Sequence, residues 1–265
     1  MVVFSHLKEL PYFCSMEVFN ISLPTNWAEL TDKQLHMVYS LFARDLSAAE
    51  VKTLCLMKWN DLKVLGQLPD KRFLIKIEKE VVPLSTRQIQ QAISVLDFLD
   101  SFAPMPVRIS RIGKYHALPA DFEKVPFEQY LYVENLFQGY LNTQNDELLL
   151  QMAQVLYASD HVKPDKAHLV GIFYWMASLK QYFAGLFSNF YKPAGANNDG
   201  NLLGSGQADL YNQLRDSTNA MIRALTGGDI TKEERIMKMN TWRALTELDA
   251  KAREAEELRK AIKKP

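Results

Sequence analysis

The side chains best suited to metal binding are histidines, cysteines and carboxylates, and in this sequence they form no recognised ligand pattern. His161, Asp165 and His168 come closest, but the step of seven residues between the two histidines matches no common zinc motif, and no cysteine assists them. An aspartate ahead of an apolar run is typical of a helix start. We therefore expect Asp165 to cap a helix and His161 to lie in the preceding turn, with no metal and no cofactor.

Motifs for nucleophilic catalysis and for phosphate binding are missing from the sequence. G-x-S-x-G does not occur, and Ser205 lies between Gly204 and Gly206 in a stretch that is typical of a linker. Gly200, Gly204 and Gly206 resemble the glycines of a dinucleotide-binding loop only by accident, because we expect no strand before them. The phosphate-loop motif G-x-x-x-x-G-K-[ST] is also absent.

The carboxylates give no sign of general acid–base catalysis. Asp97 and Asp100, like Glu233 and Glu234, lie where the surface or the first turn of a helix explains them. A carboxylate isolated within an apolar run is expected to have a raised pKa, and we identify none in the sequence. We therefore expect that the protein is not an enzyme.

Cysteine use and hydropathy favour a reducing compartment without membrane contact. Cys14 and Cys55 have apolar neighbours, so we interpret them as small buried hydrophobic residues rather than as a disulfide framework. The first residues carry no basic stretch before their apolar ones, which does not fit a signal peptide. The most apolar segment, 170–179, is about ten residues long. A membrane span needs roughly 20, so we expect a core helix.

The charge balance argues against a nucleic-acid partner. The 265 residues include 31 Lys plus Arg and 31 Asp plus Glu, so the net charge is zero, whereas nucleic-acid binders usually carry a basic excess or stripe. The basic tail 259–264 is explained by the preference of helix C-termini for cations. Glu254, Glu256 and Glu257 also cancel much of its field. We therefore expect no nucleic acid.

The elements that would position these residues are mainly helices. In a predicted N-terminal module, 1–118, the capping boxes that begin at Thr31 and Ser47 indicate a helical hairpin. Weak alternation of apolar residues over 72–82 indicates one small β-hairpin, and another helix starts at Ser85. This module is therefore expected to be helical with a minor β component.

A central helical module is predicted over 119–192, followed by a glycine-rich flexible linker over 193–206. The longest helix of this module starts at Asp165 and is apolar around most of its circumference, which is typical of a central helix. Its main apolar stripe consists of Leu169, Ile172, Met176, Leu179, Phe183, Leu186 and Phe190.

The last segment, 207–265, is predicted to be an amphipathic helical arm. Its final helix has a narrow apolar stripe with small residues and with alternating Lys, Arg and Glu on its flanks, as in helices that oligomerise or bind a partner. The predicted partner-binding face is Trp242, Leu245, Leu248, Ala252, Ala255, Leu258 and Ile262. The sequence leaves open that this helix packs back on its own domain. The whole chain is thus expected to be mainly α, a helical-bundle core with a minor β-hairpin and a C-terminal helical arm.

Two stretches resemble helical accessory proteins of tailed bacteriophages and prophages. Residues 125–157 open a helix with Phe-x-x-Tyr at Phe127 and Tyr130, continue through an acidic turn and end in Leu-x-x-Ala-x-x-Leu-Tyr. Residues 23–31 resemble the start of proteins from phages of gut anaerobes. Many of the accessory proteins are tail-assembly chaperones or virion connectors. The resemblance carries over no functional residue, because the shared pattern is structural.

The resemblance and the residues together predict a non-enzymatic bacteriophage assembly or virion structural protein. It would be a tail-assembly chaperone or a neck or tail connector. Its apolar helix faces would bind viral tail or neck proteins, or other copies of itself. It would act in the cytoplasm of the bacterial host or as part of the virion.

Two other hypotheses stay open: a cellular helical adaptor or regulator, and an unrecognised enzyme or nucleic-acid-binding module. A cellular helical adaptor or regulator would form a conditional complex with a protein partner. An unrecognised enzyme would need a deep polar pocket that gathers residues such as His116, Asp160 or His161. A nucleic-acid-binding module would show an affinity that falls steeply with salt.

Overall fold

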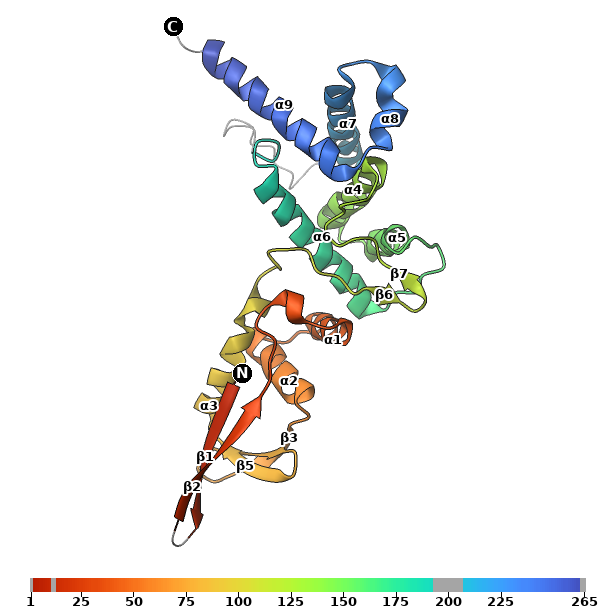
Figure 1. The fold of residues 1–265 in the computed structure, drawn as a ribbon. Coiled ribbons are helices and arrows are strands. Elements are labelled where there is room, and N and C mark those ends of the chain that lie inside the picture. Colours follow the sequence, from red (N-terminus) through yellow and green to blue (C-terminus); the bar gives the residue numbers. More distant parts are fainter. Residues whose placement is uncertain (1, 11–12, 193–206, 263–265) are drawn as a thin grey trace. The chain divides into compact units, whose positions relative to one another are not determined.

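The computed structural model describes the backbone of residues 2–10, 13–192 and 207–262, and the side chains of residues 21–192 and 212–262. The chain is mainly α-helical with a minor antiparallel β component, as predicted (Figure 1). It divides into two compact units, residues 1–103 and 104–265. The division therefore lies at residue 103, in place of the predicted 118, and the predicted linker over 193–206 lies outside the described residues.

The N-terminal unit combines short sheets with helices. Its elements in chain order are β1 (Val2–Leu10), β2 (Phe13–Ile21), η1 (Trp27–Glu29), α1 (Asp32–Phe42), α2 (Ala48–Trp59), β3 (Lys63–Gln67), β4 (Phe73–Ile77), β5 (Glu80–Leu84), α3 (Thr86–Ile93) and η2 (Ser94–Asp100).

The helices of this unit begin where the sequence predicts. At the start of α1 the Thr31 hydroxyl accepts the Gln34 backbone N–H at 3.3 Å, and the Gln34 side chain accepts the Thr31 backbone N–H at 3.0 Å. The same reciprocal capping box opens α2 at Ser47 and α3 at Ser85. Each box satisfies backbone donors that a helix N-terminus leaves without partners.

The strands extend further than predicted. The expected hairpin is β4 paired with β5, and β3 adds a third antiparallel strand with an irregular register between Val64 and Gly66. An additional hairpin, β1 with β2, pairs Val2 with Ile21 and Leu10 with Phe13. The apolar residues of these two strands do not alternate strictly with polar ones, so their sequence lacks the usual strand pattern.

Trp27 is one of the buried residues of the N-terminal unit. Its indole N–H donates to the carbonyl oxygens of Phe98 and Ser101, both at 3.0 Å, and its ring stacks on Tyr39 with the centroids 6.2 Å apart. Cys55 on α2 is buried, as predicted, and this burial raises the pKa of its thiol to about 12. The side chain of Cys14 lies outside the described residues.

The C-terminal unit is a helical bundle with one very short hairpin. Its elements are β6 (Arg111–Ile112), β7 (Tyr115–His116), α4 (Phe127–Thr143), α5 (Asp146–Leu156), α6 (Lys166–Leu186), α7 (Gln207–Thr226), η3 (Ile230–Lys232), α8 (Glu233–Met237) and α9 (Thr241–Ile262).

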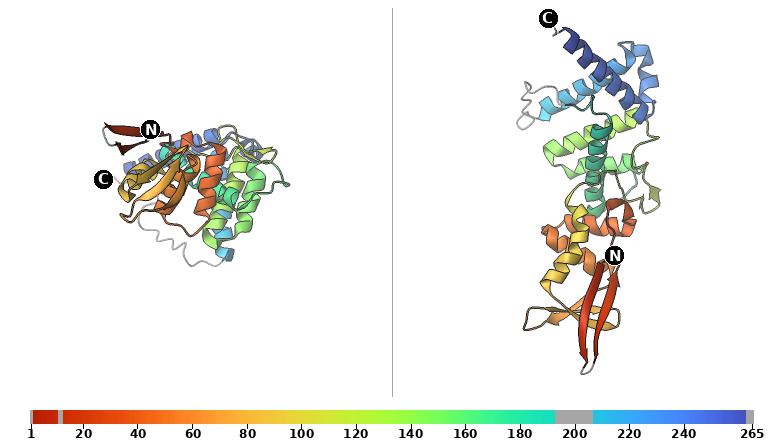
Figure 2. Two further views of the ribbon diagram at one scale, coloured as in Figure 1. Left: turned by 90° about the horizontal axis from the view of Figure 1, so that it is seen from below. Right: turned by 60° about the vertical axis from the view of Figure 1, so that its left-hand side comes forward.

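The helix α6 is central to this unit, as predicted. Trp175, Met176, Leu179 and Phe183 are buried on it, and Figure 2 shows α4 and α5 crossing it. The helix ends at Leu186, however, so the predicted stripe residue Phe190 lies beyond it. None of the helices in the described part of the chain is long and apolar enough to cross a bilayer.

The predicted modules 119–192 and 207–265 share one hydrophobic core. Leu245 and Leu248 of α9 belong to the same buried cluster as Phe127 and Phe183. The backbone joins them as well, because the Phe127 N–H donates to the Met239 carbonyl at 2.7 Å. The base of the predicted arm is therefore an integral part of the C-terminal unit.

Candidate partner-binding helix and a polar cavity

The first half of α9 packs inside its own unit. Leu245 and Leu248 are buried, and the half-buried Trp242 donates its indole N–H to the Asp121 carbonyl at 2.8 Å. The Trp242 ring also contacts Phe183 edge to face, with the centroids 6.0 Å apart. These three residues of the predicted partner-binding face are thus core residues of this chain. This part of the helix follows the alternative that the sequence left open.

Asp249 marks the point where α9 leaves the unit. Its carboxylate accepts the backbone N–H groups of Asn189 and Phe190 at 2.7 and 3.0 Å, and the Asn189 side-chain amide at 2.9 Å. Burial alone would raise the pKa of Asp249, but these hydrogen bonds outweigh it and hold the pKa below its ordinary value. The carboxylate fixes α9 to the turn that follows α6.

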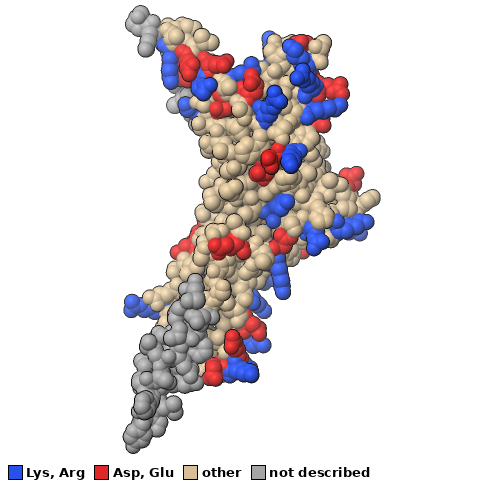
Figure 3. Space-filling view, viewed as in Figure 1, with Lys and Arg blue, Asp and Glu red and all other residues tan. Residues whose placement is uncertain are grey.

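Beyond Asp249 the apolar stripe of α9 becomes increasingly exposed toward its C-terminal end. Ala252 is half-buried and Ala255 is exposed, while Leu258 and Ile262 have 65% and 82% of their surface accessible. Residues three and four apart lie on one side of a helix, so Ala255, Leu258 and Ile262 form one face. Figure 1 shows this half of α9 extending away from α7 and α8, and in Figure 3 Lys or Arg side chains are interspersed with Asp or Glu along it.

The sequence analysis missed a buried carboxylate on α4. Glu134 lies in the apolar run from Tyr130 to Phe137, so the expectation that no carboxylate is isolated in such a run is wrong. Its side chain is only 14% exposed. One carboxylate oxygen, Oε1, contacts the Lys180 ammonium and accepts the Gln138 side-chain N–H at 2.9 Å. No described residue donates to the other oxygen, Oε2, although it is buried.

A pair of tyrosines lies beside this carboxylate. The hydroxyl oxygens of Tyr130 and Tyr191 are 2.7 Å apart. Burial raises the pKa of Tyr130 well above its ordinary value, and the negative charge of Glu134 raises it further. Burial is also the main cause that raises the pKa of Tyr191. Both phenols therefore stay protonated at neutral pH.

Glu134 and the two tyrosines line a cavity of about 350 Å³ in the C-terminal unit. The other described residues around it come from α4, from the turn after α6 and from α7: Asn135, Gln138, Asn142, Phe190, Gln213, Leu214, Ser217 and Met221. Two positions in the sequence could have indicated this polar site. Glu134 and Lys180 each interrupt an apolar helix, and an ion pair between them explains both interruptions.

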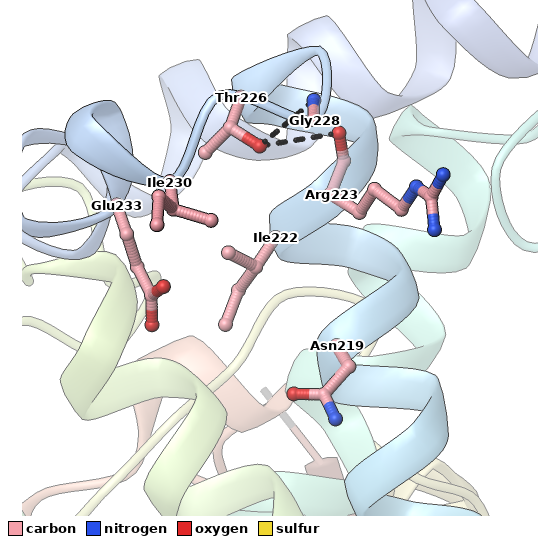
Figure 4. Close-up of a pocket in the computed structure, with 7 residues that line it drawn as sticks. All are labelled: Asn219, Ile222, Arg223, Thr226, Gly228, Ile230 and Glu233. Carbon is pink, nitrogen blue, oxygen red and sulfur yellow. Dashed lines mark hydrogen bonds between the residues drawn. The ribbon is translucent and has the colours of Figure 1, made fainter.

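A second hollow lies between α7 and α8 (Figure 4). Its volume is about 420 Å³, and Ile230 at its edge is 81% exposed. The Thr226 hydroxyl is engaged in the turn itself, since it accepts the Gly228 N–H and donates to the Arg223 carbonyl, both at 3.3 Å. The Thr226 hydroxyl therefore stabilises the turn that ends α7.

The other residues singled out in the sequence lie at a helix cap or at the surface. Asp165 is the N-cap of α6, as predicted, and its carboxylate accepts the backbone N–H of His168 at 2.9 Å. His161 lies in a turn, as predicted, and it is exposed, like His116 and Asp160.

Asp97 and Asp100 are more than surface carboxylates. They lie 2.6 and 2.5 Å from the ammonium of the buried Lys52, so the expectation that a helix surface alone explains them is corrected.

In comparisons with protein-family models, with curated proteins and with solved structures, nothing matches this chain.

Proposed function

We propose that this chain is a non-enzymatic bacteriophage assembly or virion structural protein of the connector type, which joins protein subunits through the C-terminal half of α9. One observation carries the proposal: α9 is fixed in its own core up to Asp249, whereas its apolar face continues into solvent at Leu258 and Ile262. A rigid base with an exposed apolar end presents a preformed helix face to a partner, which lowers the entropic cost of association. The assignment to bacteriophages rests on the resemblance to phage accessory proteins.

The heptad pattern of this half favours a second copy of the same chain as the partner. Ala255 and Ile262 fall at a positions and Leu258 at the d position between them. Isoleucine at a with leucine at d favours a parallel two-stranded coiled coil. In that arrangement Glu254, at g, lies next to Arg259, at e, of the other copy. Both side chains are exposed on α9. The contact is short, so the association is expected to depend on concentration.

Light scattering over a concentration series tests this function on the full chain. The wild-type mass should rise with concentration, and the double variant Leu258→Glu/Ile262→Glu should remain a monomer. Lys260→Glu is the matched control, because it changes the net charge by the same amount at an f position, on the opposite side of the helix. A monomeric wild type at every concentration would overturn the proposal, and so would an equal effect of the control.

Charge exchange tests the orientation of the two copies. Glu254→Arg and Arg259→Glu should each weaken self-association, because like charges then meet across the g and e positions. The double variant Glu254→Arg/Arg259→Glu should restore it. An antiparallel pair brings g next to g and e next to e, so the double variant would then show no recovery.

A further inference from the structure

The cavity beside Glu134 is lined by polar groups whose hydrogen-bonding capacity the described residues leave partly unused. Oε2 of Glu134 is buried, and no described residue donates to it. The hydroxyl pair of Tyr130 and Tyr191 uses one of its two protons in the mutual contact, and within the described part of the chain no acceptor is recorded for the second phenolic proton. A buried acceptor and an available donor therefore occur at one site. Leaving such groups without partners costs free energy, which a bound molecule would recover.

The charge of the site favours an uncharged ligand. Lys180 contacts the same carboxylate and balances its negative charge. Because the ion pair is already neutral, a cationic or an anionic ligand would bring an uncompensated charge into a largely buried position. A neutral molecule leaves the ion pair intact.

The hydrogen-bonding pattern favours hydroxyl groups. A hydroxyl can accept from a phenol and donate to a carboxylate at the same time, and both the tyrosine pair and Glu134 line the cavity. The amides of Gln138 and Asn142 on α4, together with the Gln213 amide and the Ser217 hydroxyl on α7, add lining groups that can donate or accept. Several hydroxyls on one ligand would match these groups.

The apolar part of the cavity favours a compact ring. Phe190 and Tyr191 pack edge to face, with their centroids 4.9 Å apart, and Leu214 and Met221 lie on the α7 side. The volume of about 350 Å³ is in the range of small-molecule sites. A pyranose has hydroxyls around its edge and C–H groups on its faces, so it matches both walls. We propose that this cavity binds a neutral pyranose sugar, with Glu134 and the Tyr130–Tyr191 pair as its central polar contacts.

Saturation-transfer NMR on the full chain tests the site with four neutral probes: glucose, galactose, mannose and N-acetylglucosamine. At least one should receive saturation from the protein. Glu134→Gln should abolish the signal, because it replaces one acceptor oxygen with an amide donor. Ser217→Trp should abolish it independently by filling the cavity from α7 without touching the ion pair. Glu147→Gln, an exposed residue on α5, is the matched control and should keep the signal.

The methyl glycoside of the bound sugar identifies its source. Binding of the glycoside as well as the free sugar indicates the end of a glycan, whereas binding of the free sugar alone indicates a small metabolite. Absence of transfer to all four sugars overturns the proposal. A signal that survives both Glu134→Gln and Ser217→Trp overturns it as well, because the sugar would be bound elsewhere.

Discussion

At the scale of single residues, Lys52 shows how a charged side chain is accommodated inside the N-terminal unit. It is only 7% exposed, and its ammonium is held by Asp97 and Asp100 of η2. Burial alone would lower the pKa of Lys52, but the hydrogen bonds to the two carboxylates outweigh it and raise the pKa. The ion pair thus links α2 to η2 and stabilises the contact between them.

Replacing this lysine should destabilise the N-terminal unit. Lys52→Met keeps the aliphatic chain and removes the charge, and it should lower the free energy of unfolding by about 1–2 kcal/mol, since the two carboxylates are partly solvated. The stabilisation is fully present below the unfolded-state pKa, near 10.4, and is lost as the pH rises through the higher folded-state pKa. Urea unfolding of wild type and variant should therefore differ at neutral pH and converge at alkaline pH. Lys58→Met, at an exposed position of the same helix, should have little effect. An equal loss in both variants would contradict the role of Lys52.

At the scale of elements, the Asp249 carboxylate joins α9 to the turn after α6. Asp249→Ala removes three hydrogen bonds to a charged acceptor and should cost about 1–3 kcal/mol. Because the folded-state pKa of Asp249 is lowered, its contribution is present above the unfolded-state pKa, near 3.9, and is lost as the pH falls through the lower folded-state value.

Hydrogen exchange locates that effect. In the Asp249→Ala variant the amides of Asn189 and Phe190 should exchange faster at neutral pH, while those in the middle of α4 should be unchanged. Glu254→Ala, further along the same helix, controls for the loss of a carboxylate. Unchanged exchange at Asn189 and Phe190 would show that the carboxylate does not hold the turn.

The elements also show what a sequence can predict. Helix starts at Thr31, Ser47, Ser85 and Asp165 are determined by side chains within three residues, so local reasoning finds them. The hairpin of β1 and β2 has no such local signal. The contact of Trp242 with Asp121 joins residues 121 positions apart, and no local pattern records it.

The same distinction applies to the cavity. Glu134 stands out in the sequence as a charge in an apolar run, which is a local signal that a closer reading could have used. Its partners Lys180 and Tyr191 come from another helix and from the turn after it, so only the packing of the unit reveals the ion pair and the tyrosine contact. The candidate sugar site therefore could not be assembled from the sequence.

At the scale of the whole molecule, the division into two units determines what a truncation removes. The first residue of α9 is joined to the segment before α4. The Thr241 N–H donates to the Val125 carbonyl at 2.9 Å, and the Thr241 hydroxyl donates to the same oxygen at 2.7 Å. Trp242 and Leu245 complete the core against α6. The C-terminal unit should therefore fold as one cooperative body that includes α7, α8 and α9.

A chain that ends at Lys192 tests this arrangement. Its loss of α9 uncovers Phe127 and Phe183, each of which is fully buried in the intact unit, and exposing such side chains costs about 1.5–3 kcal/mol apiece. Hydrogen exchange should then be fast throughout α4 and α6, whereas α1 and α2 of the other unit should keep their protection. Retained protection in α6 would show that α7 to α9 form a separate domain. If α6 loses protection, a change in the mass of this truncated chain reports unfolding of the unit and not loss of a binding surface. The role of the exposed face of α9 in self-association is then tested by the Leu258→Glu/Ile262→Glu variant of the intact chain.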